Sequence, residues 1–508
     1  MSLTKVTYSM IDGAAINVLD YGATGDGVTN DQAALSAAFN AAAATGKTVY
    51  VPAGDYLSNN LIGVTLTSST NGISVVCDAG ATFIKSASFP DDKQLFLFLA
   101  TSGDQSVSWI GGKLDGRLAP VRASATAPDL MAINGGQAYI KKVYVSDVYF
   151  LSNDDRTGTA GDSCLFVAGC DDVSIVNNVF QGAVDLGLYI SGQSTTFVGK
   201  RIYVAGNKFI ECIFGIGSKR EYQTHIIQNN FFKNNNICIF IGGETEFANT
   251  AQKAIISGNI IENCGRGIES RVSNGAIITG NRIEDFGLSA TGTPTNEAGV
   301  LVSGSQNCII SDNNIGFSGA FTPVAGTSAV RFASRTLGAT TYTPEYNYVT
   351  DNSIYNCPEG VVEVTGSGAN NNVLINNQFR NVPSNYQVIG ANTNYGQIVN
   401  LIGEDPVLTI QDTESTVGNA NAKIILAESG AGGVIDNDWS VHFDGTNGRQ
   451  GLDFKYNNVS RFRVNGDTVS SNFAPTTTPS AANAGDVYYD SGTNKLRCYN
   501  GTIWNDLF

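Results

Sequence analysis

Between Val173 and Phe379 the chain repeats one short pattern of apolar and polar positions: an apolar residue, two further residues, an Asn, one residue, and a second apolar residue. The pattern occurs eight times, and both outer positions are apolar in every copy. Successive Asn residues are 29, 23, 29, 22, 32, 39 and 25 positions apart. A repeat with a fixed corner and a variable length predicts a solenoid whose insertions are confined to loops. The copies are Ile175–Asn178–Phe180, Val204–Asn207–Phe209, Ile227–Asn230–Phe232, Ile256–Asn259–Ile261, Ile278–Asn281–Ile283, Ile310–Asn313–Ile315, Val349–Asn352–Ile354 and Leu374–Asn377–Phe379.

Short β-branched segments lie between these corners, such as Ala254–Ser257 and Gly299–Ser303. They predict strands, and no helical period separates them. Asn tolerates the left-handed backbone that a sharp corner requires, and Asn side chains stacked at the strand spacing hydrogen-bond to one another. A β-sandwich with Asn-rich turns is the alternative, but it needs period-two strands and hairpin turns. We therefore predict an all-β chain folded as a parallel β-helix.

Ahead of the repeats, the segment 17–31 precedes a predicted helix that begins at Gln32 and is stopped by Gly46. Thr29 and Gln32 have the spacing of a capping box. A strand and turn follow over residues 48–56. The helix carries one apolar stripe, formed by Leu35, Ala38 and Phe39.

This N-terminal block closely resembles the signature of the pectate-lyase-like β-helix superfamily, which is found in phage tailspikes and bacterial pectinolytic enzymes. The resemblance implies a right-handed, single-stranded parallel β-helix whose open end is covered by the short helix. It indicates little about the chemistry, because the superfamily contains hydrolases, lyases and epimerases.

Two earlier corners carry Gly112 and Val148 where the later ones have Asn, and after about Leu401 the corner pattern ends. The terminal stretch 485–504 resembles a β segment common at the ends of phage tail fibres and spikes. The predicted organisation is an N-terminal lead-in (1–19), the β-helix domain (20–403), a C-terminal β domain (404–474), and a linker with the terminal β segment (475–508).

Together the two resemblances imply a phage tailspike. Such a protein is a homotrimer located in the virion, at the phage tail, in contact with other tail or baseplate proteins, and it is made in the host cytoplasm. The short C-terminal strands have too little apolar surface to fold alone, which also favours a trimerisation region there.

The composition argues against several other classes of protein. The net charge of −15 argues against binding to nucleic acid or to anionic membranes. Nine Cys at irregular spacing do not form a disulfide framework, so we expect folding in a reducing cytoplasm. No apolar run is long enough for a membrane span, and we expect no export signal. Several Cys are expected in the core, namely Cys212, Cys264, Cys308 and Cys357.

The wall of a β-helix is a long ladder that suits a polysaccharide. Aromatic side chains stack on sugar faces, whereas carboxylates and Arg bind hydroxyl and charged groups. A solvated wall or a contact between protomers is the alternative. Alignment of the coils after each corner puts one outward residue per coil on a single row: Tyr189, Phe240, Glu269, Leu301 and Arg331.

Hydrolysis of a glycosidic bond requires two carboxyl groups. The segments Gly161–Val167 and Asp185–Gly192 resemble, in degraded form, the polygalacturonase pattern of an Asp-Asp-Cys strand followed by Gly-His-Gly. The match implies that Asp162 is the general acid, and it puts Asp129 near a further catalytic Asp of that family. This chain departs from the polygalacturonase pattern at two positions: Ser163 replaces its second Asp, and Leu186 or Asp185 occupies the position of its His. Two loop residues, Asp154 and Asp155, are candidates for the missing water-activating carboxylate.

A second charged cluster follows in the next coils and is a candidate for substrate contacts or for an alternative acid–base pair. His225 is expected to be packed in the core, no zinc spacing exists, and Asp171 and Asp172 are expected to be solvated rather than to bind Ca²⁺. We predict no cofactor. The cluster comprises Lys219, Arg220, Glu221, Glu244, Glu246, Glu269 and Arg271.

Three functions fit these residues. An endo-acting glycoside hydrolase on a bacterial capsule or O-antigen is the leading hypothesis. A polysaccharide lyase in the same role needs a base and a neutralising cation, for which Lys219, Arg220 and Tyr189 are the obvious supply. A non-enzymatic adhesive or structural tail protein is the third, in which case the carboxylates are merely solvated.

Overall fold

The computed structural model divides into two units, Met1–Ile398 and Val399–Phe508, each of which is described separately. The sequence puts the corresponding boundary between residues 403 and 404. In the second unit the structure describes the strands given below, residue 484 and residues 486–507. In the first unit it describes residues 13–70, 72–119, 129–136, 139–152, 163–192, 199–219, 222–242, 253–288, 297–320, 322–388 and 392–396.

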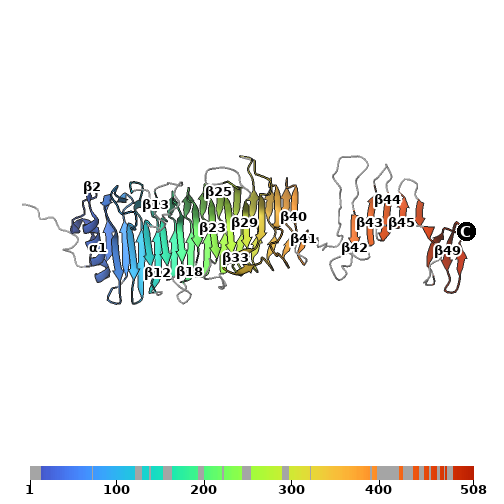
Figure 1. Cartoon of the computed structure of the whole chain (residues 1–508), viewed down its shortest axis with the longest axis horizontal. Helices are drawn as coiled ribbons and strands as arrows, with labels where there is room; N and C mark the ends of the chain where they lie inside the picture. The colour runs from blue at the N-terminus through green and yellow to red at the C-terminus, as the bar shows by residue number, and fades with distance from the viewer. Residues whose placement is uncertain are drawn as a thin grey trace, which may run out of the picture. The chain divides into compact units, whose positions relative to one another are not determined.

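The first unit is a parallel β-helix, as predicted. Its strands form three sheets in which hydrogen-bonded neighbours are parallel and come from successive coils, so the coils stack along the long axis of the unit (Figure 1). Sheet A consists of β1 (Ile16–Asn17), β3 (Thr48–Val51), β6 (Ile73–Cys77), β9 (Gln105–Ile110), β12 (Ile140–Ser146), β15 (Cys170–Val176), β18 (Gly199–Ala205), β21 (Tyr222–Gln228), β24 (Lys253–Ser257), β27 (Ile277–Thr279), β30 (Ile309–Ser311), β35 (Tyr348–Thr350), β38 (Val373–Ile375) and β41 (Asn394–Gly396). Sheet B consists of β2 (Asp26–Asn30), β4 (Gly54–Ser58), β7 (Ala81–Lys85), β10 (Lys113–Asp115), β13 (Tyr149–Leu151), β16 (Val179–Gln181), β19 (Lys208–Ile210), β22 (Phe231–Lys233), β25 (Ile260–Cys264), β28 (Arg282–Phe286), β31 (Asn314–Gly316), β36 (Ser353–Tyr355) and β39 (Gln378–Arg380). Sheet C consists of β5 (Ile62–Leu66), β8 (Phe96–Ala100), β11 (Met131–Asn134), β14 (Leu165–Ala168), β17 (Leu186–Ser191), β20 (Phe214–Ser218), β23 (Ile237–Gly242), β26 (Arg266–Arg271), β29 (Ala298–Ser303), β32 (Ser328–Ala333), β37 (Glu359–Glu363) and β40 (Ser384–Gln387).

The predicted helix is present as α1 (Gln32–Thr45), and it lies at the N-terminal, blue end of the coils in Figure 1, next to the short 3-10 helix η2 (Val18–Tyr21). Its buried stripe reaches the core, where the Phe39 ring centroid lies 5.4 Å from that of Phe96 and 5.8 Å from that of Trp109. Gly46 ends the helix in the left-handed conformation. The helix therefore covers the end of the apolar interior.

The predicted capping box is wrong. The N-cap residue is Asp31, whose side chain makes no capping hydrogen bond but accepts one from the backbone N–H of Thr24 at 2.7 Å. The hydroxyl of Thr29 donates to Asp26 instead, at 2.7 Å. The loop before the helix holds both side chains, which a local sequence pattern does not reveal.

The eight corner Asn residues form a continuous ladder of amide hydrogen bonds, as predicted. Asn178 Nδ2 donates to Asn207 Oδ1 at 3.0 Å, and the same bond recurs along the row until Asn352 donates to Asn377 at 2.8 Å. Each side chain is buried and each amide also donates to a backbone carbonyl, for example Asn259 to Ile227. The intermediate links join Asn207, Asn230, Asn259, Asn281, Asn313 and Asn352 at 2.9–3.0 Å.

The left-handed residue at each corner is not the ladder Asn but the residue before it. These preceding residues have φ between 55° and 68°, whereas the ladder Asn residues avoid positive φ. A residue that tolerates this conformation, Gly, Asn or Asp, stands there in every copy, and the ladder Asn is free to use its amide. The eight preceding residues are Asn177, Gly206, Asn229, Gly258, Gly280, Asp312, Asp351 and Asn376.

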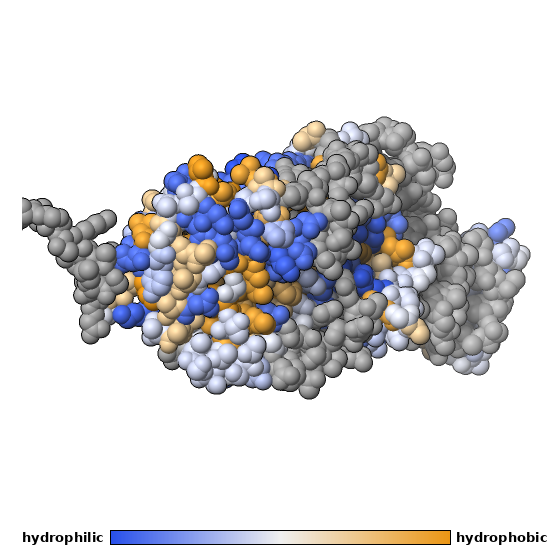
Figure 2. All heavy atoms as spheres, turned by 60° about the vertical axis from the view of Figure 1, so that its left-hand side comes forward, coloured by the Kyte–Doolittle hydropathy of each residue, from blue (hydrophilic) through white to orange (hydrophobic). Residues whose placement is uncertain are grey.

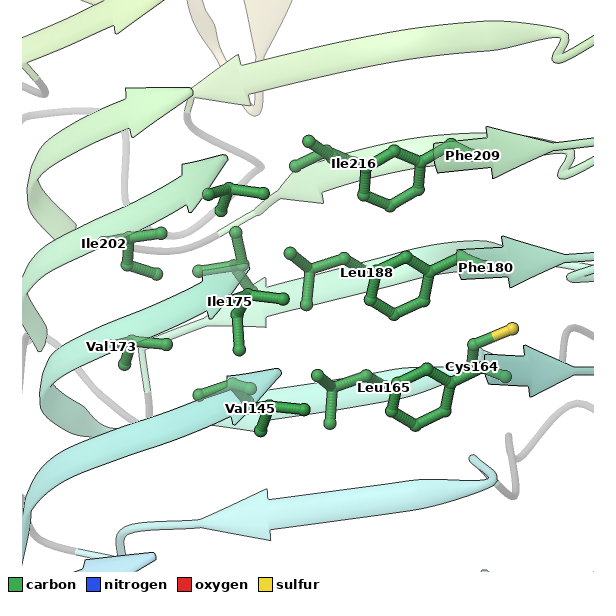
Figure 3. Close-up of a cluster of buried hydrophobic side chains, with 14 of the residues drawn as sticks. Val145, Cys164, Leu165, Val173, Ile175, Phe180, Leu188, Ile202, Phe209 and Ile216 are labelled. Carbon is green, nitrogen blue, oxygen red and sulfur yellow. The ribbon is translucent and has the colours of Figure 1, made fainter. Parts of the chain in front are cut away.

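Inward side chains stack in columns along the axis. Figure 3 shows Leu165, Leu188 and Ile216 above one another and facing the stacked rings of Phe180 and Phe209. Successive Phe rings lie 4.7–4.9 Å apart from Phe150 to Phe232. Eight of the nine Cys are buried, including the four predicted in the core. A coil cannot bury these faces alone, so each coil is stabilised by its neighbours.

The second unit contains two further sheets. One is an antiparallel sheet of β42 (Lys423–Leu426), β43 (Trp439–Asp444), β44 (Gly451–Tyr456), β45 (Val459–Asn465) and β46 (Ser470–Phe473). The other joins β47 (Pro475–Thr476), β48 (Val487–Asp490), β49 (Lys495–Tyr499) and β50 (Trp504–Asp506). The role of this unit in trimerisation stays a prediction. The described part of the chain has no helix long and apolar enough to cross a membrane.

Candidate functional site

One row of outward residues, here called the sheet C row, crosses sheet C at one residue per coil. The alternate residues of the same strands, such as Leu188, Ile239 and Ile268, are buried in the core, so the row lies on the outer face. The five positions predicted from alignment of the coils do share this row. In register, the row runs Phe166, Tyr189, Gly217, Phe240, Glu269, Leu301, Arg331, Val362 and Gln387.

An aromatic and cationic group occupies the first part of the row. The rings of Phe166 and Tyr189 lie 4.9 Å apart. Lys219, directly after β20, places its Nζ 5.3 Å from the centroid of the Tyr189 ring. Tyr189 and Lys219 are both half-buried, so each keeps some surface toward solvent. An aromatic face beside an ammonium group suits a sugar that carries a negative charge.

Phe240 does not offer its ring to solvent, because it is only 1% exposed. Its ring and the side chain of Leu186 fill the space over Gly217, where a Cβ would meet both. The guanidinium of Arg271 lies on the ring, with Cζ 4.0 Å from the centroid. The expectation that Phe240 stacks on a sugar is therefore wrong in this structure. The ring instead supports Arg271.

Glu269 is likewise buried, at 1% exposure, and is held by three arginines. Its carboxylate accepts from Arg266 at 2.5 Å, from Arg271 at 2.8 Å and from Arg335 at 3.5 Å. Burial by itself raises the pKa of Glu269, but the hydrogen bonds and charges of Arg271 and Arg266 outweigh it, and the pKa is lowered. An ionised, enclosed carboxylate is a poor general acid and a poor direct contact for substrate. Glu269 holds the arginines in place, so its predicted acid–base and substrate-binding roles are corrected.

Arg331, in the last part of the row, lies in a concavity of about 390 Å³ that Glu359, Glu363 and Gln387 also line. Its guanidinium donates to the carbonyl of Gly326 and, through Nε, to Ser328 Oγ at 3.0 Å. Burial lowers the pKa of Arg331. A half-buried guanidinium in a polar concavity is suited to carboxylate or hydroxyl groups of a sugar.

Two of the candidate carboxylates lie just before strands of the same sheet. Asp129 is 4% exposed and precedes β11, and the half-buried Asp185 directly precedes β17. Between them lies β14, and Ser163 before it is fully buried. Backbone hydrogen bonds connect these strand starts: the Ser163 carbonyl accepts from Leu130 at 3.0 Å, and the Leu186 carbonyl accepts from Cys164 at 2.9 Å. The other predicted residues lie outside the described residues, namely Asp154, Asp155, Asp162, Arg220, Glu221, Glu244 and Glu246.

Two expectations about residues away from the row have opposite outcomes. His225 is packed as predicted: it is fully buried, its Nε2 lies 2.9 Å from Ser218 Oγ, and burial lowers its pKa to about 4. Asp171 is not solvated. It is 4% exposed and pairs with Lys200 at 2.9 Å and with Lys141 at 3.3 Å. The two lysines come from the coils on either side, and only the coil register brings them to it.

The sequence interpretation missed two arginines and one carboxylate of the buried cluster. Arg266 begins β26 and contacts Glu297 at 2.6 Å as well as Glu269. Arg335 lies in the hairpin of β33 (Arg335–Leu337) and β34 (Thr340–Tyr342), 66 residues after Glu269. Arg266 carries a usable signal, because it lies three residues before Glu269. Nothing in the sequence pattern connects Arg335 to the site.

Comparison with known sequence families covers the β-helix in two parts. Residues 15–237 match the family described as rhamnogalacturonase A/epimerase, pectate lyase-like, and residues 214–400 match the right-handed β-helix region. The predicted pectate-lyase-like, right-handed parallel β-helix is therefore confirmed.

Individual proteins and solved structures are also similar to parts of this chain. The mannuronan C5-epimerase AlgE5 of Azotobacter vinelandii is 63% identical over 41 residues, which is 8% of this chain and 4% of the epimerase, so the chain spans a small part of the length of such relatives. The Dettilon tailspike protein (gp208) has 14% identity and a TM-score of 0.52, over 88% of this chain and 80% of that one. The family 28 exopolygalacturonase of Yersinia enterocolitica has 12% identity and a TM-score of 0.52, over 77% and 79%. The 14% and 12% identities to these two solved structures indicate a shared fold alone.

Proposed function

We propose that this chain is a phage tailspike that binds a bacterial surface polysaccharide, capsule or O-antigen, and cleaves it by endo-glycosidic hydrolysis. One observation carries the proposal: the sheet C row lies on the outer face of sheet C, and Asp129 and Asp185 lie just before two strands of the same sheet. A long outward ladder suits an extended polymer, and glycosidic cleavage requires a pair of carboxyl groups. The family match and the tailspike and exopolygalacturonase folds support a polysaccharide substrate.

We draw the catalytic pair from Asp129, Asp162 and Asp185. Adjacent coils are about 4.8 Å apart. Asp129 precedes β11 and Asp185 precedes β17, which lies two coils further on. Asp162 lies outside the described residues, and the sequence pattern predicts it one coil before Asp185. A separation of one coil is close to that of retaining enzymes, and two coils, about 10 Å, is close to that of inverting enzymes. We assign Asp162 as the acid, with Asp185 or Asp129 as its partner. Asp154 and Asp155 are alternative water-activating carboxylates.

Substrate contacts are proposed for the exposed parts of the row. Tyr189 supplies a ring, Lys219 an ammonium group, and Arg331 a guanidinium in its concavity. Arg271 lies between them on the Phe240 ring. The loop residues Arg220, Glu221 and Glu244 are proposed to complete the face. The functional protein is proposed to be a homotrimer of the virion, attached to other tail or baseplate proteins.

A lyase is the second candidate, and the contact between Lys219 and the Tyr189 ring favours it. A lyase removes a proton next to a uronate carboxylate, for which a Tyr or Lys base beside a cation is suitable.

Incubation with purified capsule or O-antigen separates the candidates. A hydrolase releases reducing ends without new ultraviolet absorbance, whereas a lyase releases reducing ends together with the absorbance of an unsaturated uronate. An epimerase gives neither but changes the proton NMR spectrum of the polymer. Binding with no chemical change in any assay contradicts the enzymatic proposal and leaves an adhesive tail protein.

A further inference from the structure

The outer face of sheet A carries its own row of residues. From Tyr144 to Val373 this row, a segment here called the sheet A row, is almost entirely apolar. Its members alternate with buried core residues such as Val145, Val204 and Ile256, so they point outward. Ser174 is the single polar member of this segment apart from the tyrosine hydroxyl groups. The outward residues that continue the row beyond the segment are polar: Ser108, Ser74 and Thr48 at one end and Asn394 at the other. In register, the row runs Tyr144, Ser174, Tyr203, Ile226, Ile255, Ile277, Ile309, Tyr348 and Val373.

Five of these nine side chains are exposed to solvent in the isolated chain, and the other four, Ser174, Ile226, Ile277 and Val373, are half-buried. Ile255 and Ile309 are each 39% exposed, and Tyr348 is 50% exposed. Eight coil steps make the row about 40 Å long. Figure 2 shows apolar side chains, in orange, at the surface of the face that it presents. Single exposed apolar residues away from the row, such as Leu118 and Ile260, need no partner. A continuous apolar stripe of this length marks an interaction surface.

The rows beside the stripe are polar. On the N-terminal side of each strand the neighbouring row carries Lys142, Asp172, Arg201, Thr224 and Lys253, and Arg201 pairs with Asp172 at 2.7 Å. On the other side the row is made mostly of small or hydroxyl residues: Ser146, Val176, Ala205, Gln228, Ser257, Thr279, Ser311 and Thr350. An apolar centre containing Tyr, flanked by polar residues, is the arrangement of a protein–protein interface.

We propose that copies of this chain pack side by side along the sheet A row. A straight stripe that repeats at every coil is matched by an equally long and equally straight surface, which a second copy provides. Each copy has a net charge of −15, so an uncharged stripe is where copies approach with least repulsion. Ile side chains offer a sugar neither a flat ring nor a hydrogen bond, so a second protein surface suits them better than a polysaccharide. The number of copies, three, rests on the proposed tailspike function.

The mass of the full chain in solution provides the first test. Wild-type protein is expected to be a trimer by light scattering, and Ile255→Lys with Ile309→Lys is expected to dissociate at least about a hundredfold more readily, because the charges become buried at the contact. Ile260→Lys is the matched control, since Ile260 is 41% exposed but lies on sheet B. A monomeric wild-type protein overturns the proposal.

Proximity provides a second test, which holds even if the C-terminal unit also joins the copies. In a Cys498→Ser background, which removes the half-buried thiol, Ile255→Cys and Ile260→Cys are treated with a short bis-maleimide. The proposal expects covalent dimers from Ile255→Cys and not from Ile260→Cys, and equal linking of the two overturns it. Neither test uses a sugar, so failure of the proposed enzymatic function leaves both results interpretable.

Discussion

Sheets A and C both bury their inward side chains in the core, but their outer rows differ: the sheet C row includes Glu269 and Arg331, whereas the sheet A row has no charged member. In both sheets an Ile or Val column fills the interior, for example Ile256 in sheet A and Ile268 in sheet C, and both are fully buried. One position along the strand, the outer row of sheet A carries exposed Ile255, whereas that of sheet C carries buried Glu269 among arginines. At these two positions the expected inside–outside rule is inverted, because the apolar residue is in water and the charge is enclosed.

The contrast indicates that the interior of the coils determines the fold, while the outer rows are free to specialise. A coil is stabilised by inward columns and by the corner ladder, and both continue past sheet A and sheet C without regard to the outer residues. Enclosed charges require pairing, which costs desolvation and is retained where a fixed geometry has a use. Exposed aliphatic side chains persist where another surface covers them. We therefore assign chemistry to sheet C and assembly to sheet A.

The largest effect is expected from the candidate carboxylates. Asp185→Asn keeps the size and removes the charge, so turnover on the polysaccharide should fall by at least about a hundredfold. The solution mass should not change, because Asp185 belongs to the sheet C face. Asp104→Asn is the control, since the Asp104 side chain is 81% exposed, and it should retain full turnover.

Asp162→Asn should also lower turnover by at least about a hundredfold in the same assay. Asp171 is unsuitable as a solvated control for either variant, because it is paired with two lysines. Full activity of both Asn variants would leave the carboxylate mechanism without its acid, and activity would then have to be sought at the loop residues Glu221 and Glu244.

The next largest effect concerns the enclosed charge. Glu269→Gln leaves three arginines without their common carboxylate, and the free energy of unfolding should fall by about 3–5 kcal/mol. The pKa of Glu269 is lowered in the fold from its usual 4.5, so its stabilising effect is complete above about pH 4.5 and is lost as the pH falls through the folded value. Urea titrations should show the difference between wild type and variant shrinking below that pH. A difference that does not depend on pH contradicts the ion-pair account.

Much of the sheet C row could be predicted from the sequence, because the number of residues between a corner Asn and the outward position is the same in several coils. Phe240 and Glu269 each lie ten residues after a ladder Asn, at Asn230 and Asn259, so alignment of the coils places them correctly. Whether an outward residue stays in solvent could not be predicted in this way. Glu269 is enclosed partly by Arg335, which comes from an irregular hairpin 66 residues later. Burial on the outer face depends on such loop contacts, and no periodicity encodes them.

A smaller effect is expected at the corner that sheets A and B share. Asn259 donates to Asn281 at 2.9 Å and to the Ile227 carbonyl at 3.0 Å, so Asn259→Ala should cost roughly 1–3 kcal/mol of unfolding free energy. The neighbouring Gly258 keeps the left-handed corner, so no added strain is expected. Turnover and solution mass of the folded protein should both be unchanged. Normal stability combined with lost activity would mean that the ladder serves the site and not the fold.

The smallest effects are expected from replacing a Tyr by Ala in each of the two outer rows, which compares the two faces with the same substitution. Tyr189→Ala removes a ring from the sheet C row, and a lost stacking contact of about 1 kcal/mol should raise KM roughly fivefold with the solution mass unchanged. Tyr203→Ala removes a ring from the sheet A row, where Tyr203 is 36% exposed and accepts a hydrogen bond from Gln228. It should weaken self-association by a similar factor and leave KM unchanged, because we propose that this face contacts a second copy and not the polysaccharide. If both variants raised KM equally, the separation of chemistry from assembly would be wrong, and the polysaccharide would have to bind across the junction between copies.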